Sequence, residues 1–281
     1  MAAKILDGKK LADEFLHEIT SRVHALKALH VAPGIAAILV GEDEASRTYV
    51  GMKREAAEKC GFHSVVRELP SSSATEEVIA AIAELNSDPA IHGIMVQLPL
   101  PKGVDRAAVL ESILPSKDVD GLTSTSLGAI ASRMNGFVPA TARGVIELLK
   151  LTGVALKGKS ACVIGEGMQT GRPIALLLLN EFATVTVCHV HTHGVAEIAA
   201  NSDILVSAVG KPNLVDGGMV KQGAIAIDVG ISKAGGKVAG DFDFDSVSHK
   251  AAWVTPVPGG VGPMTVAMLL LNTVEAAERT L

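Results

Sequence analysis

Tyr49 and Lys53 lie four residues apart in a segment with helical periodicity, so we expect both side chains on one face of a helix, one turn apart. A lysine beside a phenol in a partly desolvated cleft loses some of its preference for the charged form, and the neutral amine can then accept a proton near neutral pH. The alternative is an exposed pair on a surface helix, which needs no function. The pair predicts proton transfer if other residues converge on it.

Two loops provide further side chains for the same face. Gln97 follows an apolar strand expected at 93–96, in the run VQLPLP, and Asp120 lies in the run KDVDG. Loops that follow the strands of an α/β sheet often deliver side chains to a ligand cleft. We assign Asp118 to the turn itself, as an aspartate that accepts hydrogen bonds from backbone N–H groups, and keep Asp120 as a candidate site residue.

The glycine-rich run VIGEGMQTGRP lies between an expected strand at 160–164 and an expected helix at 171–179. Its glycines, Gly165, Gly167 and Gly171, open a helix whose N-terminal amide dipoles suit a pyrophosphate. The spacing is one residue longer than the usual dinucleotide fingerprint, and no acidic residue ends the next strand. The alternative is a glycine turn required only for packing a helix on a strand.

The run TPVPGGVGPMT at 255–265 contains three prolines and three glycines. This composition predicts an irregular segment that forms neither a helix nor an interior strand and that lines a ligand. The alternative is a long turn between a strand that ends at Val254 and an apolar helix from Met264 to Arg279.

Helical and strand periods alternate along the chain, which predicts an α/β fold with buried parallel sheets. We expect an N-terminal α/β domain at 1–140, a Rossmann-like domain at 141–263, a boundary near 139–141 and a final helix, 264–281, that packs back on the first domain. Ser73 with Glu76 predicts a capping box. The other expected helices are 8–29, 46–59 and 195–201, and the other expected strands are 35–40, 64–69, 184–188, 204–207 and 224–228.

The composition favours small molecules over nucleic acids as partners. The chain has 281 residues, of which 48% are hydrophobic and 20% are charged, with a net charge of −5, one Trp and one Tyr, so a nucleic-acid surface is not expected. It shows no secretory signal and no uncharged apolar run long enough for a membrane span. Together with three widely spaced cysteines, which we interpret as reduced thiols, these features predict a cytoplasmic protein.

Two clusters could suggest a metal, and we predict none at either. His189, His191 and His193 alternate at the end of a strand, and we place them at the rim of an adenosine pocket instead. The run DFDFD at 241–245 lacks the glycine and the glutamate that a calcium loop requires, so we interpret it as a turn before a short helix.

Taken in order, these motifs and AIDVGI around Asp228 resemble the bifunctional methylenetetrahydrofolate dehydrogenase/methenyltetrahydrofolate cyclohydrolase family over nearly the whole chain. The resemblance implies a catalytic N-terminal domain, a C-terminal dinucleotide-binding domain, a folate cleft between them and a homodimer joined through the dinucleotide-binding domains. It also implies hydride transfer from 5,10-methylenetetrahydrofolate to a nicotinamide, followed by hydrolysis of the methenyl product to 10-formyltetrahydrofolate.

The resemblance also assigns roles to individual residues. Lys53 handles protons in the hydrolytic step, Gln97 holds it in position, Tyr49 orients the folate and Asp120 accepts hydrogen bonds from the pterin. The remaining substrate-binding residues are Val96, Leu98, Pro258, Gly259 and Gly262. The cofactor-binding residues are Thr141, Gly165, Glu166, Gly167, Gly171, His189, Val190, His191 and Ile231.

One departure from the family pattern is Pro-Ala-Thr-Ala at 139–142, where the family usually has Pro-Cys-Thr-Pro, and the other two lie in the cofactor site. Glu166 and Gly167 stand where the family typically has Arg-Ser, and Val190 and His191 stand where it typically has Ser followed by Lys or Arg. Both changes remove ligands for the 2′-phosphate of NADP, so of NAD and NADP we favour NAD. Two alternatives stay open: a cyclohydrolase with a degenerate dinucleotide site, and a non-catalytic folate or dinucleotide sensor.

Overall fold

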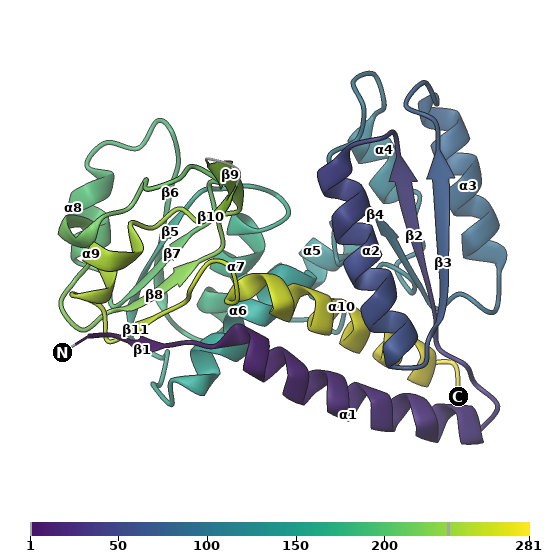
Figure 1. Ribbon diagram of the computed structural model, residues 1–281, viewed down its shortest axis with the longest axis horizontal. Helices are drawn as coiled ribbons and strands as arrows, with labels where there is room; N and C mark the ends of the chain where they lie inside the picture. The colour runs from purple at the N-terminus through teal and green to yellow at the C-terminus, as the bar shows by residue number, and fades with distance from the viewer. Residues whose placement is uncertain (1, 235–236) are drawn as a thin grey trace. The chain divides into compact units, whose positions relative to one another are not determined.

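The computed structural model describes residues 2–234 and 237–281, which form two compact units (Figure 1). The three-stranded unit comprises Glu14–Ala140 and Val266–Leu281, and the six-stranded unit comprises Met1–Asp13 and Thr141–Thr265. All pairing within the two main sheets is parallel, which confirms the predicted α/β fold. Within the described residues, no helix is both long enough and apolar enough to cross a membrane.

In the three-stranded unit, β2 (Gly34–Val40) lies between β3 (His63–Leu69) and β4 (Gly93–Val96). Every residue of the central strand β2 and of the edge strand β4 is buried, as expected for a parallel sheet whose faces are covered by helices. Helix α2 (Glu44–Lys59) packs against β2 and β3, and α3 (Thr75–Ser87) packs against β4 (Figure 1). The other helices of this unit, in whole or in part, are α1 (Gly8–Ala28), α4 (Arg106–Glu111), α5 (Ser124–Ala131) and α10 (Val261–Glu278).

The six-stranded unit has the strand order β1-β11-β8-β7-β5-β6. Counted from β5, this is the doubly wound order 2-1-3-4-5 with one added strand, and the switch point of such a sheet lies between its first and third strands, here β5 and β7. Its strands are β1 (Lys4–Ile5), β5 (Ser160–Ile164), β6 (Thr184–Cys188), β7 (Ile204–Ser207), β8 (Ile225–Asp228) and β11 (Trp253–Val254). The helices are α6 (Ala140–Leu151), α7 (Gly171–Asn180), α8 (Val195–Ala200) and α9 (Phe244–Ser248), with a 3₁₀ turn at Gly217–Met219 and an antiparallel pair, β9 (Ser232–Ala234) and β10 (Lys237–Ala239).

Strand β1 brings the first residues of the chain into the sheet that is otherwise built after residue 140. Lys4 pairs with Trp253 and Ile5 with Val254, both in parallel. Residues 1–13 therefore group with Thr141–Thr265, whereas the sequence-based division places them with the rest of 1–140. A strand of two residues has too short a pattern to be seen in the sequence.

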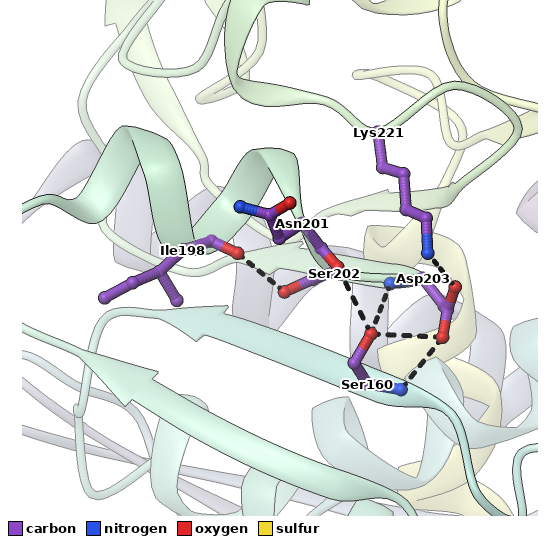
Figure 2. A network of polar contacts seen from close by, with 6 residues as sticks. All are labelled: Ser160, Ile198, Asn201, Ser202, Asp203 and Lys221. Carbon is purple, nitrogen blue, oxygen red and sulfur yellow. Dashed lines mark hydrogen bonds and ion pairs between the residues drawn. The ribbon is translucent and has the colours of Figure 1, made fainter.

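A polar network joins the amino ends of β5 and β7 (Figure 2). The Asp203 carboxylate accepts hydrogen bonds from the Ser160 backbone N–H at 3.0 Å and from the Lys221 amine at 2.6 Å. The Asp203 N–H donates to the Ser160 hydroxyl at 3.0 Å, so the two strand ends bind each other in both directions. The Lys221 hydrogen bond, followed by the Ser160 N–H, lowers the pKa of Asp203 to about 2.

The structure corrects two sequence-based predictions about helix starts. Helix α10 begins at Val261, so Gly262 and Pro263 form part of its first turn, where a proline is tolerated because the N–H it lacks has no helical partner. Only residues 255–260 keep the predicted irregular path. The predicted capping box of Ser73 and Glu76 is also wrong. The N–H of Ser73 bonds to Pro70 in the preceding turn, and Glu77 accepts the N–H of the N-cap residue Ala74.

Candidate active site

Helix α2 carries Tyr49 and Lys53 on its half-buried side. The helix begins after Asp43, whose carboxylate accepts the Ser46 N–H at 2.7 Å, and its buried residues include Val50 and Ala57. This packing fixes the rotation of the helix. Tyr49 and Lys53, next to the buried positions, are therefore only partly exposed.

Gln97 contacts Lys53 directly. Its backbone N–H donates to the Ile38 carbonyl at 2.9 Å, which continues the pairing of β4 with β2. The Lys53 amine donates to Gln97 Oε1 at 3.2 Å, and Gln97 Nε2 donates to the Leu98 carbonyl at 2.8 Å. The second bond orients the amide, so that its oxygen is the atom presented to Lys53.

Asp118 and Asp120 have different surroundings although they are two residues apart. The Asp118 carboxylate is fully buried and accepts hydrogen bonds from the N–H groups of Leu122 and Thr123 and from the Ser126 hydroxyl at 2.6 Å. It organises the turn, as expected for a turn-forming aspartate. Asp120 is half-buried and interacts electrostatically with Lys53.

Burial changes the acid–base properties of these side chains. It lowers the pKa of the Lys53 amine, and the Asp120 carboxylate opposes that change. Burial also raises the pKa of Asp120, which Lys53 lowers and the nearby Asp118 raises further. The pKa of Tyr49 is raised by burial as well. The arrangement favours an amine that loses its proton more readily than a surface lysine.

The glycine-rich turn lies at the switch point of the six-stranded sheet. Gly165 follows β5 with φ of +103°, and a Cβ there would lie 2.6 Å from the carbonyl oxygen of Ala208, which follows β7. A Cβ on Gly171 would collide with the Gly165 carbonyl, whereas a Cβ on Gly167 would meet no atom within 4 Å. Two of the three glycines are thus required by close packing, and the third borders open space.

Glu166 and Arg172 form an ion pair across this turn. Arg172 Nη2 donates to Glu166 Oε2 at 3.0 Å, and Arg172 Nε donates to the Glu166 backbone carbonyl at 3.0 Å. Sequence reasoning missed Arg172, although its position one residue inside the predicted helix, six residues after an acidic residue, was a usable signal.

The remaining predicted cofactor residues of this unit lie on loops and at a helix start. His189, Val190 and His191 form an exposed turn after β6, closed by the His189 N–H to Thr192 Oγ1 at 2.9 Å. Ile231 is exposed after β8, and Thr141, in the first turn of α6, accepts a hydrogen bond from Thr265 at 3.2 Å. Among the residues that the structure describes, no group of three or more His, Cys, Asp or Glu is arranged to hold a metal ion.

The predicted substrate residues fall in both units. The Lys53 group, which comprises Tyr49, Lys53, Gln97 and Asp120, belongs to the three-stranded unit together with Val96 and Leu98. Pro258, Gly259 and Gly262 belong to the six-stranded unit. In the latter, Gly259 has φ of +108° and its carbonyl accepts the Lys9 N–H at 2.9 Å, so this segment is held against the start of α1.

Two buried carboxylates, to which the sequence analysis assigned no hydrogen-bond partners, shape the loop after β8. Asp228 accepts the N–H groups of Gly230, Asp241 and Phe242 at 2.9 to 3.0 Å. Asp241 accepts hydrogen bonds from the Ser207 hydroxyl and from the N–H groups of Val209 and Lys211. Burial raises the pKa of Asp228 to about 6. Together they link the loops that follow β7 and β8.

Comparisons with known proteins match two successive parts of the chain to one family. Residues 6–120 match the family model described as tetrahydrofolate dehydrogenase/cyclohydrolase, catalytic domain, and residues 139–281 match the model described as tetrahydrofolate dehydrogenase/cyclohydrolase, NAD(P)-binding domain. The curated "Bifunctional protein FolD" of a Nitratiruptor species is 49% identical over 98% of each chain.

Solved structures give the same result. The bifunctional methylenetetrahydrofolate dehydrogenase/cyclohydrolase of Campylobacter jejuni superposes with a TM-score of 0.98 at 44% identity, over 100% of both chains. The Trypanosoma brucei dehydrogenase-cyclohydrolase, solved with NADP and an inhibitor, superposes with a TM-score of 0.96 at 42% identity, over 100% of this chain and 99% of that one.

Proposed function

This chain belongs to the tetrahydrofolate dehydrogenase/cyclohydrolase family, and on that premise we propose that it oxidises 5,10-methylenetetrahydrofolate to the methenyl form and hydrolyses the methenyl form to 10-formyltetrahydrofolate. The observation that carries the proposal is the hydrogen bond between Lys53 and Gln97, which fixes a lysine of lowered pKa on the half-buried face of α2.

The hydrolytic step needs a group that accepts a proton. When water attacks the methenyl carbon, a new carbon–oxygen bond forms and a proton leaves the water. The neutral amine of Lys53 accepts this proton, and its lowered pKa increases the neutral fraction near neutral pH. Transfer of that proton to the ring nitrogen, as its bond to the same carbon breaks, restores the neutral amine. The oxygen then releases the second proton of the water to solvent, which gives the neutral formyl product.

The other residues of the Lys53 group bind and orient the substrate. Gln97 holds the amine through an amide that Leu98 orients, and Asp120 accepts hydrogen bonds from the N–H groups of the pterin. Tyr49 places its ring against the folate. We also assign Val96, Leu98, Pro258, Gly259 and Gly262 to the folate site, with residues 1–140 and the C-terminal helix as the catalytic domain and 141–263 as the dinucleotide-binding domain.

The residues at the switch point fit a dinucleotide. Gly165 allows the close approach of the loop after β7, Gly171 allows α7 to pack against Gly165, and Gly167 borders the open space where we place the pyrophosphate. The bound nicotinamide supplies the acceptor for the hydride. Because hydride transfer itself requires no acid or base, the chain contributes positioning, for which we propose Thr141, Ile231, His189 and the Gly165 turn.

We propose that NAD is preferred over NADP. Glu166 places a carboxylate at the mouth of the turn, and the Val190 side chain is 92% exposed and offers no polar group to a 2′-phosphate. A carboxylate accepts a hydrogen bond from a free ribose 2′-hydroxyl and repels a phosphate. His191, on the same exposed turn, is the alternative phosphate ligand if NADP is used.

Two further proposals concern the state of the protein in the cell. The family resemblance supports a homodimer joined through the dinucleotide-binding domains. The cysteines, Cys60, Cys162 and Cys188, are buried free thiols, which supports a reducing compartment such as the cytoplasm.

The test is an assay of the purified protein with the methylene substrate and saturating NAD or NADP in parallel, following reduced nicotinamide and methenyl product. Turnover with NAD exceeding turnover with NADP is the expected result. Turnover with neither cofactor, while added methenyl substrate is still hydrolysed, would show a cyclohydrolase with a degenerate dinucleotide site. Absence of both reactions, with folate still bound, would support a sensor.

A further inference from the structure

The ion pair between Glu166 and Arg172 affects the choice between NAD and NADP at the dinucleotide site, an inference that rests on the proposed function. Two nitrogens of Arg172 donate to the same residue: Nη2 donates to the Glu166 carboxylate and Nε to the Glu166 backbone carbonyl, each at 3.0 Å. A guanidinium bound at two points has a defined direction. The guanidinium of Arg172 is therefore held beside Glu166 in the glycine-rich turn and does not extend freely into solvent.

A contribution to folding stability does not account for the ion pair between Glu166 and Arg172. The side chains of Arg172 and Glu166 are 53% and 47% exposed, and exposed ion pairs contribute little to folding stability. The ion pair does fix the position of the Glu166 carboxylate. Arg172 holds Glu166 through Oε2, and no hydrogen bond to Oε1 is found in the part of the chain that the structure describes. Oε1 is thus available as an acceptor for a ribose hydroxyl.

The charge of the turn depends on this pair alone. Between Gly165 and Arg172 the sequence is GEGMQTGR, so Glu166 and Arg172 are its only ionisable residues and their charges cancel. Without the carboxylate, the turn would carry one positive charge on a guanidinium, beside the open space at Gly167 and the N-terminal end of α7. A planar guanidinium suits a phosphate, which it can bind through two nitrogens.

We propose that Arg172 is a specificity-determining residue of the dinucleotide site. Paired with Glu166, it holds the carboxylate in position for a free 2′-hydroxyl and is itself unavailable to a phosphate. When the Glu166 carboxylate is removed, Arg172 becomes a ligand for the 2′-phosphate. The preference between NAD and NADP is then set by what Arg172 binds, and not by repulsion from Glu166 alone.

The experiment measures equilibrium binding of NAD and NADP by calorimetry, without folate and without turnover. The proteins are the wild type, Glu166→Gln, Arg172→Gln and the double variant, with Glu181→Gln as the matched control. Glu181 is the exposed C-cap residue of the same helix, so its variant makes the same change in net charge at the opposite end of α7. Thermal unfolding of each protein checks that it is folded.

The proposal expects Glu166→Gln to strengthen NADP binding about tenfold or more, and Arg172→Gln to abolish that gain in the double variant. Arg172→Gln alone should weaken NAD binding severalfold, because the carboxylate is no longer held. Glu181→Gln should leave the ratio of the two affinities within about twofold. Arg172→Lys in the Glu166→Gln background should keep part of the gain, since it keeps the charge but not the planar fork.

A gain in NADP binding that is equally large in the double variant would overturn the proposal, because repulsion by Glu166 would then explain it alone. No gain in Glu166→Gln would overturn it as well. Both results leave the proposed function standing, provided that the wild type binds NAD. A wild type that binds neither nucleotide, while the same preparation hydrolyses the methenyl substrate, would instead overturn this proposal and the dehydrogenase half of the function together.

Discussion

The Lys53 group and the Gly165 turn are built in different ways. The Lys53 group consists of half-buried side chains, among which Lys53 on α2 donates a hydrogen bond to Gln97, directly after β4, and interacts electrostatically with Asp120. The Gly165 turn is shaped by backbone packing, in which Gly165 and Gly171 leave no room for a side chain. Its charged side chains, Glu166 and Arg172, are about half exposed.

The difference bears on which positions tolerate substitution. Tyr49, Lys53, Gln97 and Asp120 are partly buried, whereas positions 166, 167, 190 and 191 are exposed. A partly buried side chain in a hydrogen-bonded group is costly to replace, while a substitution at an exposed position changes stability little. Chemistry can therefore stay constant in one region while ligand preference changes in the other.

The largest effect is expected at Lys53. Lys53→Met should lower the rate of methenyl hydrolysis by about 100-fold to 10,000-fold, the usual contribution of a positioned acid or base, and should lower dehydrogenation less. The decay of the methenyl substrate measures the first and the appearance of reduced nicotinamide the second. Lys59→Met is the control, because Lys59 lies on the same helix with its amine at the surface, paired with Glu55. Equal losses in both reactions would contradict the separate roles of the two regions.

The next effect is expected in the glycine-rich turn. Gly171→Ala should weaken dinucleotide binding by more than about tenfold and destabilise the protein by about 1–3 kcal/mol, because its Cβ collides with backbone at Gly165. Gly167→Ala should have a much smaller effect, since its Cβ meets no atom within 4 Å. Methenyl hydrolysis should be retained in both. Calorimetric titration with NAD and denaturant unfolding measure the two quantities, and equal effects of the two substitutions would show that close packing does not shape the turn.

A smaller effect, on pH dependence, is expected at Asp120. Hydrolysis by the neutral amine should increase as the pH rises through the pKa of Lys53, and Asp120 raises that pKa. Asp120→Asn should therefore move the rising limb of the pH–rate profile to lower pH, and should weaken folate binding by about tenfold through loss of a charged acceptor. Glu55→Gln, a surface change on α2, should leave the profile in place. A shift of the rising limb to higher pH would contradict the proposed interaction of Asp120 with the Lys53 amine.

The smallest effect is expected at the opposite end of the nucleotide-binding sheet, at Asp203. Its pKa of about 2 lies below the ordinary 3.8, so its contribution to stability is present above that ordinary value and is lost as the pH falls toward about 2. Asp203→Asn should cost about 1 kcal/mol at neutral pH, a figure reduced for the partial exposure of the Lys221 pair, and the difference from wild type should disappear near pH 2. Urea unfolding measures it, and NAD binding should not change.

Much of the fold was predictable because the strands and helices have clear periods. The runs GIAAILV and GIMV are continuous and apolar, as buried parallel strands require, and they form β2 and β4. Helix starts were less predictable, because several neighbouring residues can serve as the cap or the first residue of a helix. Pro263 proved compatible with the first turn of α10, and Ser73 was already used in the turn before α3.

The unpredicted parts of the candidate site depend on contacts between segments. Arg172 reaches back across a folded turn to Glu166, and Asp228 binds backbone groups more than ten residues away at Asp241 and Phe242. A sequence pattern shows which side chains can make such bonds but not which segments come together.

The pairing of β1 with β11 has a consequence for biosynthesis. Lys4 and Ile5 are translated long before Trp253 and Val254, their partners. The three-stranded unit can begin to fold once β2, β3 and β4 have emerged from the ribosome, whereas the six-stranded sheet cannot gain its edge strand until residues 253 and 254 have emerged. A change in the segment before α1 would therefore act late in folding, on closure of that edge.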